Sequence, residues 1–236
     1  MASVDRKWLP PTLIAVAFLA SAAVYNRLPA MVDFQFGPVL PFATSPATGP
    51  APRWLALFLV PVMALVIWTA FRLAPTAGGQ RLARRMFRHA PEEVTSPGQF
   101  ERFGKTYDAI VLGVILLLLG FHTAVMAAAL HAPPAMVSRI VPAVIGVCLI
   151  LMGNVMPRLR ANWVAGIRTR RTLEDPRLWR STHRAFGAAF VVSGLATIIA
   201  AVLAPQWGIL IAIVSVFASC VVGGVASMRG KEVSIS

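Results

Sequence analysis

The sequence predicts an all-α membrane protein: a polytopic bundle of six transmembrane helices with both termini in the cytoplasm. Hydrophobic residues make up 57% of its 236 residues and charged residues only 13%, whereas about a quarter of the residues in a soluble domain are charged. The mean hydropathy is +0.72. Six apolar runs are each long enough to cross about 30 Å of hydrocarbon as a helix. We therefore expect residues 1–236 to form one integral membrane domain.

The apolar runs pair into three hairpins joined by polar connections. The six runs are Trp8–Tyr25, Trp54–Phe71, Ala109–Leu130, Ile140–Met156, Phe186–Leu203 and Trp207–Met228. The expected divisions are a first hairpin with a proline-rich outer loop at 1–71, a basic cytoplasmic loop at 72–106, a second hairpin at 107–156, an arginine-rich cytoplasmic loop at 157–185, and a third hairpin with a tail at 186–236.

The basic residues predict the orientation of these hairpins. Of the 22 lysines and arginines, two precede the first run, seven lie in the second connection, eight in the fourth and two in the tail, against three in the other connections. Because basic loops stay in the cytoplasm, both termini are placed there. The net charge of +13 is then a topology signal. It makes anionic lipids the expected partners and gives no support for direct binding of nucleic acid.

The first two connections predict little regular structure. Five prolines within residues 38–52 favour extended or turn-like backbone on the outer side. In the second connection, four arginines between Arg81 and Arg88 recur at helical spacing, which predicts a short helix at the membrane surface. Residues 100–107 then run straight into the third span.

The fourth connection carries the highest density of charge, with eight arginines between Arg158 and Arg184. Such a density cannot enter the bilayer core, so this connection lies at the membrane surface. Pro157 cannot extend the preceding helix, and the chain turns out of the membrane there. Gly166 allows a positive φ and a close approach of another chain segment.

A helix is predicted to follow and to continue into the fifth run. Thr172 or Asp175 can cap it, and Pro176 fits its first position. Its two sides differ, with aromatic residues and a histidine on one face and arginines on the other: Trp179, His183, Phe186 and Phe190 against Arg177, Arg180 and Arg184.

Fourteen residues of this region resemble the signature of the SdpI family, which comprises bacterial membrane proteins with six spans. The family signature has approximately the form G-N-x-x-P, followed by N-x-x-x-G-I-R-T, then T-L, and finally W-x-x-T-H-R. Here it is carried by Gly153, Asn154, Pro157, Asn162, Gly166, Ile167, Arg168, Thr169, Thr172, Leu173, Trp179, Thr182, His183 and Arg184. Arg170-Arg171 stands where the family usually has Pro-Trp.

The resemblance implies a location in the bacterial cytoplasmic membrane. It also implies immunity to a secreted peptide toxin that acts on membranes. A cytoplasmic regulator, such as a transcriptional repressor that is recruited to the membrane, is the second partner that the family implies.

A second segment, directly after the first run, resembles the same family and is expected to meet an extracellular ligand. Its residues are Tyr25, Asn26, Leu28 and Pro29. Gln35 follows them where the family usually has a histidine. Arg6 and Lys7, the apolar run from Trp8 and the A-x-A pattern at Ala20-Ser21-Ala22 are together similar to a cleavable secretory signal. The family segment after it favours retention of this run as a span.

The signature predicts a polar site beneath the bundle, for which two interpretations stay open. Its members are Asn154, Asn162, Gly166, Arg168, Thr169, Thr172, Trp179, His183 and Arg184. The loop can fold on itself, with Arg168 bonding carbonyls and Thr172 capping a helix. Alternatively, it can present a docking surface, because arginine binds carboxylate or phosphate groups through two parallel hydrogen bonds.

Asp108 and His122 lie in or beside the third run, and ionisable groups at membrane depth often mark a functional site. A transporter of a small solute or lipid would line a water-accessible cavity with His122, Asn154 and Asp108. A neutral histidine bonded to a neighbouring helix is the alternative.

Catalysis has little support in the sequence. It contains no HExxH, GxSxG or Walker motif. The two cysteines form no metal-binding motif, so neither a metal nor a cofactor is expected. A lipid-modifying enzyme that uses His183 and the arginines on a lipid phosphate is the enzymatic alternative. We expect instead a non-catalytic protein that gives resistance to a membrane-active toxin.

Overall fold

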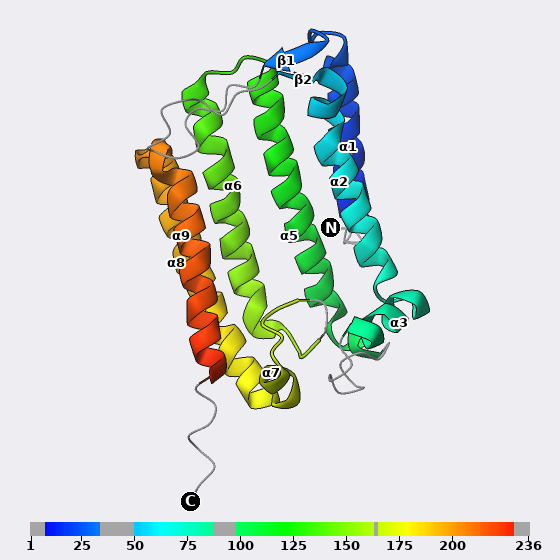
Figure 1. The fold of residues 1–236 in the computed structure, drawn as a ribbon, viewed down its shortest axis with the longest axis vertical. Coiled ribbons are helices and arrows are strands. Elements are labelled where there is room, and N and C mark those ends of the chain that lie inside the picture. Colours follow the sequence, from blue (N-terminus) through cyan, green and yellow to red (C-terminus); the bar gives the residue numbers. More distant parts are fainter. Residues whose placement is uncertain (1–7, 34–49, 87–97, 163–164, 229–236) are drawn as a thin grey trace, which may run out of the picture.

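Six long helices run through the structure, a computed structural model that describes residues 8–33, 50–86, 98–162 and 165–228. In chain order the elements are α1 (Leu9–Tyr25), β1 (Met31–Asp33), β2 (Pro50–Pro52), α2 (Arg53–Leu73), α3 (Ala77–Met86), α5 (Gly98–Ala129), α6 (Pro134–Val155), a 3-10 turn (Met156–Arg158), α7 (Arg170–Glu174), α8 (Pro176–Leu203) and α9 (Pro205–Met228). Successive long helices run in opposite directions (Figure 1).

The two ends of the bundle carry different connections (Figure 1). α3, α7 and the end of α9 lie at the lower end, whereas β1, β2 and the turns between α5 and α6 and between α8 and α9 lie at the upper end. The lower end carries the arginine-rich fourth connection, so the positive-inside rule makes it the cytoplasmic end.

The bundle has the length and the surface of a membrane domain. Five helices, α2, α5, α6, α8 and α9, are long and apolar enough to cross a membrane, and α1 is a shorter apolar helix of 17 residues. Large apolar side chains such as Leu19 and Phe217 face outward, each 69% exposed. In a bilayer these side chains meet lipid tails. The prediction of an all-α polytopic membrane bundle is confirmed.

Two helices extend well beyond the apolar runs, as the sequence indicates. α5 begins at Gly98, and α8 begins at Pro176, ten residues before the fifth run. α6 also begins earlier than expected, at Pro134, where Pro133 and Pro134 start the helix. Each extension places a polar or basic helical turn at the end of a span.

Glycine pairs bring α6 and α8 into close contact. A Cβ on Gly146 would lie 2.8 Å from the Gly194 carbonyl oxygen, and a Cβ on Gly153 would lie 2.6 Å from that of Gly187. The glycines are seven residues apart on each helix, which is about two turns. Small residues at this spacing let two helix backbones approach closely in a membrane.

Small residues on α9 let this helix approach α8 closely. Ser193 of α8 bonds to the Ser219 hydroxyl at 3.0 Å and donates to the Ser215 carbonyl at 3.1 Å. A Cβ on Gly223 would clash with side chains from other parts of the chain. The small-residue stripe of α9 therefore packs within the molecule.

The outer connection contains a short strand pair, which the sequence does not predict. β1 and β2 pair in antiparallel fashion, with Val32 opposite Ala51. Val32 is buried and packs with Leu28, Leu57 and Ala129. The prolines at both ends of β2 are compatible with this pairing because a two-stranded sheet leaves one side of each strand without a partner.

Candidate functional site

The arginine-rich loop leaves α6 through the 3-10 turn and is anchored to α8 by a tryptophan. Trp179 is 1% exposed, and its indole N–H donates to the Leu159 carbonyl at 2.7 Å. Leu159 and Leu173 join Trp179 in a buried cluster that also includes Met156. The loop therefore forms a small core of its own beneath the helices.

Asn162 closes the first turn of the loop. Its side-chain amide donates to the Arg160 carbonyl at 2.8 Å, and its carbonyl oxygen accepts the Ala165 N–H at 2.8 Å. The residue is fully buried. A buried loop must satisfy its backbone groups without water, and one asparagine here satisfies two of them.

Gly166 is required by both its conformation and its surroundings. Its φ is +105°, in the left-handed region that favours glycine. A Cβ at this position would lie 2.2 Å from Nε2 of His183. The missing side chain thus leaves room for the imidazole ring.

His183 is held on both of its ring nitrogens. Nε2 accepts the Ile167 N–H at 3.1 Å, and Nδ1 lies 2.8 Å from the Trp179 carbonyl. Because a backbone N–H can only donate and a carbonyl can only accept, the imidazole is neutral with its proton on Nδ1. The ring also stacks on Trp179, with centroids 3.9 Å apart. No nitrogen of this fully buried ring is left over for proton transfer.

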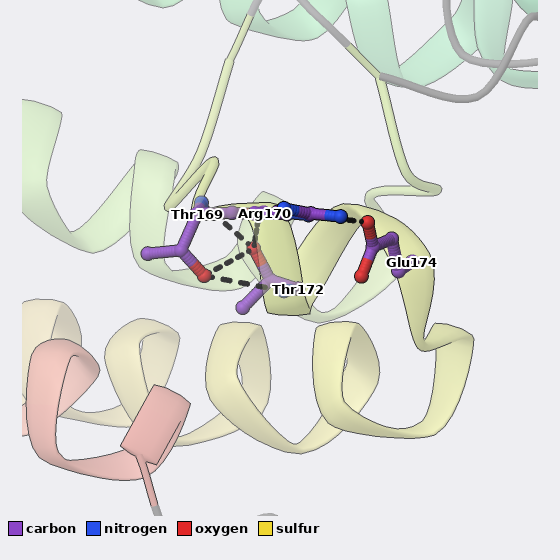
Figure 2. A network of polar contacts seen from close by, with 4 residues as sticks. All are labelled: Thr169, Arg170, Thr172 and Glu174. Atoms are coloured by element: carbon purple, nitrogen blue, oxygen red, sulfur yellow. Dashed lines mark hydrogen bonds and ion pairs between the residues drawn. The ribbon is translucent and has the colours of Figure 1, made fainter. Parts of the chain in front are cut away.

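Two threonines cap α7 reciprocally, as Figure 2 shows. The Thr169 hydroxyl accepts the Thr172 N–H at 3.2 Å, and the Thr172 hydroxyl accepts the Thr169 N–H at 3.0 Å. The Thr172 hydroxyl also donates to the Ile167 carbonyl at 2.7 Å. This is a capping box in which threonine takes the place of the usual Glu or Gln.

The caps differ in one respect from the sequence-based expectation. Thr169 is the N-cap residue of the five-residue α7, and Thr172 is its reciprocal partner rather than a cap of the long helix. Asp175 caps α8, where its carboxylate accepts the Arg177 N–H at 2.7 Å and Pro176 occupies the first position. The chain therefore makes two helix starts within seven residues.

Arg168, Arg170 and Arg184 of this connection are exposed. Arg170 pairs with Glu174 at 2.9 Å on the exposed side of α7 (Figure 2), and this hydrogen bond raises the pKa of the Arg170 guanidinium. Arg168 is at the surface of the loop, where partial burial lowers the pKa of its guanidinium. Arg184 is exposed on α8. Asn154 is exposed as well and donates to the Ile150 carbonyl of its own helix.

The loop also touches the last helix through Ile167, a contact that sequence patterns did not suggest. A Cβ on Gly223 of α9 would lie 2.2 Å from Cδ1 of Ile167 and 3.1 Å from the Phe186 ring. The small residue on α9 therefore receives a side chain of the loop. Ile167 and its neighbours join three parts of the chain: the loop, α8 and α9.

The outer segment is held by Arg53, whose role was also missed. The Arg53 guanidinium lies over the Tyr25 ring at 4.4 Å and donates to the Leu28 carbonyl at 3.0 Å. Leu28 is buried, while Asn26 and Pro29 are exposed. The sequence signal that could have indicated this role is the position of Arg53 directly before an apolar run. Gln35 lies outside the described residues.

His122 and Asp108 do not come together in the structure. They are 14 residues apart on α5, a rise of about 21 Å. His122 is 4% exposed and contacts the Ser21 hydroxyl through Nε2 at 3.1 Å, and Ser21 in turn donates to the Leu57 carbonyl. Among the described residues, the ring's other nitrogen, Nδ1, has no hydrogen-bond partner at normal distance.

Metal ligands do not cluster in the part of the chain that the structure describes. No group of three or more His, Cys, Asp or Glu residues there is arranged to hold an ion.

Comparison with known proteins finds a family similarity that covers this site. The model of the SdpI/YfhL protein family matches residues 158–227, which include the arginine-rich loop and the third hairpin. The chain is 23% identical over 215 residues to Immunity protein SdpI of Bacillus subtilis (strain 168), an alignment that covers 91% of this chain and 90% of the relative. No solved structure matches. With its six apolar helices in hairpin order, the described part of the chain is that of a multi-pass protein of the bacterial inner membrane, and its residues 158–227 are similar to the SdpI/YfhL protein family.

Proposed function

We propose that this protein protects its producer against a secreted, membrane-active peptide toxin, and that it does so without catalysis. The observation that carries the proposal is the alignment with Immunity protein SdpI, because it extends over nine-tenths of both chains. The family match also falls on the loop whose signature residues bond to one another.

The outer end of the bundle is the proposed contact for the toxin. Tyr25 and Arg53 order the segment that leaves α1, and Asn26, Arg27 and Pro29 are exposed there. A peptide that reaches the membrane from outside meets this surface first. Gln35, which follows in the same outer segment of the sequence, is included in the proposed toxin contact.

The cytoplasmic loop is the proposed docking surface for a regulator such as a repressor. Its buried residues, Asn162, Thr172 and His183, would fix the shape of the loop rather than touch a partner. Its exposed arginines would make the contact, since guanidinium groups suit the carboxylates of an acidic protein surface. Ile167 gives the loop a direct contact with α9, through which a change in the bundle would reach it.

The two alternatives have less support from the arrangement of the residues. A transporter that uses His122, Asn154 and Asp108 would need them around one cavity, yet the first and last are about 21 Å apart along α5. A lipid-modifying enzyme that uses His183 would need a free ring nitrogen, and both nitrogens are engaged within the protein.

Expression in a sensitive strain tests the proposed immunity. Cells that carry the protein are challenged with peptides concentrated from the spent medium of the source bacterium, and survival is compared with that of cells carrying an empty vector. We expect protected growth, reduced by Arg53→Gln and retained in Arg81→Gln, which removes one exposed charge at the other end. Equal sensitivity of protected and vector cells, at confirmed membrane levels of the protein, would overturn the proposal.

A further inference from the structure

A two-part groove lies along α8 at the cytoplasmic end of the bundle, and α9 lines only its apolar part. One part is apolar and is lined mainly by Leu178, Val221, Val222 and Val225. The other part is basic and is lined mainly by Arg177, Arg180 and Arg184. Ser181 and Ala185 line both parts, so the two hollows adjoin. Their small side chains leave the passage between the parts open.

The basic part carries a positive charge that the loop's own acids do not balance. Residues 156–187 contain only two acids, Glu174 and Asp175. Glu174 pairs with Arg170 on α7, and Asp175 accepts the backbone N–H of Arg177 as a helix cap. Within residues 156–187, the three exposed arginines on one side of α8 therefore face at most one carboxylate, and this part of the groove is complementary to an anion.

The groove sits at the depth where hydrocarbon gives way to headgroups. The apolar run of α8 begins at Phe186, only two residues after Arg184. Val222 and Val225 of α9 are 43% and 41% exposed, and they face outward from the bundle. Arginine at the end of a span reaches the headgroup layer while the adjoining apolar surface stays among the lipid tails.

We propose that this groove is a binding site for one anionic phospholipid. The arginine part holds the phosphate of the headgroup, because guanidinium groups bind phosphate oxygens through paired hydrogen bonds. The valine part holds the upper segment of one acyl chain along α9. A zwitterionic lipid such as phosphatidylcholine fits the apolar part equally well and also carries a phosphate, but its cationic choline group cancels that charge and is repelled by the three arginines. The site thus selects by headgroup charge, and it does not depend on the proposed immunity.

Native mass spectrometry of the purified full-length protein tests this site. The protein in detergent is mixed with equal amounts of dioleoyl-phosphatidylglycerol and dioleoyl-phosphatidylcholine, and bound adducts are counted. We expect one retained phosphatidylglycerol in preference to phosphatidylcholine. The R177Q/R180Q/R184Q variant should lower this adduct by about tenfold or more, since each basic residue at an anionic surface contributes on the order of fivefold in affinity.

A matched variant removes the same charge elsewhere on the cytoplasmic end. R81Q/R158Q/R160Q changes three exposed arginines outside the groove and should keep the adduct. Equal losses in both triple variants, or equal binding of the two lipids by the unmodified protein, would overturn the site. Thermal unfolding of each variant shows whether a loss comes from misfolding.

A further variant separates a lipid site from a simple charged surface. Ala185→Leu fills the passage between the two parts while all three arginines remain. We expect it to lower the phosphatidylglycerol adduct several-fold and to leave the weak binding of glycerol phosphate, which has no acyl chain, unchanged. An unaltered phosphatidylglycerol adduct in Ala185→Leu would overturn the acyl-chain part of the proposal.

Discussion

Two buried histidines lie at different depths of this protein, and their surroundings differ in kind. His183 has a partner on each ring nitrogen and a tryptophan stacked on its face. His122 has a close side-chain hydrogen bond with Ser21, and its Nδ1 has no hydrogen-bond partner at normal distance among the described residues. Burial alone therefore does not show what a histidine contributes. The number of hydrogen bonds and stacking contacts that the ring makes decides how much its removal destabilises the fold.

The largest expected effect comes from Gly166→Ala, which leaves His183 unchanged but places a side chain against its ring. The substitution forces a side chain into a φ of +105° and places Cβ 2.2 Å from Nε2. Strain and clash together should cost about 4 kcal/mol in the free energy of unfolding, or prevent folding of the loop. Thermal unfolding in detergent measures the change.

Gly224→Ala on α9 is the matched control, because outside the neighbouring helix backbone no described atom lies within 4 Å of the Cβ it would add. Alanine also favours a helix more than glycine does, so its unfolding temperature should stay the same or rise. A mild effect of Gly166→Ala, comparable to this control, would contradict the close approach of the loop to His183.

His183→Ala should have the next largest effect, because it leaves the Ile167 N–H and the Trp179 carbonyl without their side-chain partner and opens a cavity beside the indole. We expect a loss of about 3 kcal/mol. His183→Gln should recover part of it if the amide oxygen takes over the bond to Ile167. A shift in tryptophan fluorescence should accompany the alanine variant, since the ring stacks on Trp179.

The architecture around these histidines followed from simple physical signals. Apolar runs of sufficient length predicted the spans, and the uneven distribution of arginine predicted which end faces the cytoplasm. The continuation of α8 from a surface helix into a span was also visible, because Trp179 and His183 recur on one face. The pairing of β1 with β2 was not, since prolines at both ends of β2 suggest an irregular chain.

The signature residues could be found by their spacing, but their contacts could not. Gly166 and His183 are 17 positions apart, and only the folded loop brings one against the other. The contact of Ile167 with Gly223 likewise depends on how α8 packs against α9. Arg53 was missed because its partners, Tyr25 and Leu28, belong to another element. Contacts of this kind depend on tertiary packing, and the local sequence pattern around each residue does not show them.

Thr172→Val tests the polar half of the loop at nearly constant volume. Valine keeps the shape but loses the hydroxyl that accepts the Thr169 N–H and donates to the Ile167 carbonyl. We expect a loss of about 1–2 kcal/mol in the free energy of unfolding. Thr172→Ser retains the hydroxyl and should lose less than Thr172→Val, whereas the reverse order would show that the methyl group matters more than the bonds.

His122→Leu is the counterpart of His183→Ala and should be far milder. The substitution removes the hydrogen bond to Ser21, but it also removes a buried Nδ1 that has no partner at normal distance among the described residues, and Ser21 keeps its bond to the Leu57 carbonyl. These opposing changes should leave the free energy of unfolding within about 1 kcal/mol of the original. A loss as large as that of His183→Ala would show that His122 has partners of similar strength and would remove the contrast between the two sites.

Arg170→Gln should have the smallest effect, although the residue lies beside the network of His183. Its ion pair with Glu174 is on the exposed side of α7, and water and salt screen such pairs. Neither residue contacts the Thr169 and Thr172 hydroxyls that order the turn (Figure 2). Thermal unfolding at low and at high salt should therefore give the same midpoint for Arg170→Gln and the unmodified protein. A clear drop at low salt only would mean that the exposed pair, and not the buried threonines, holds the start of α7 in place.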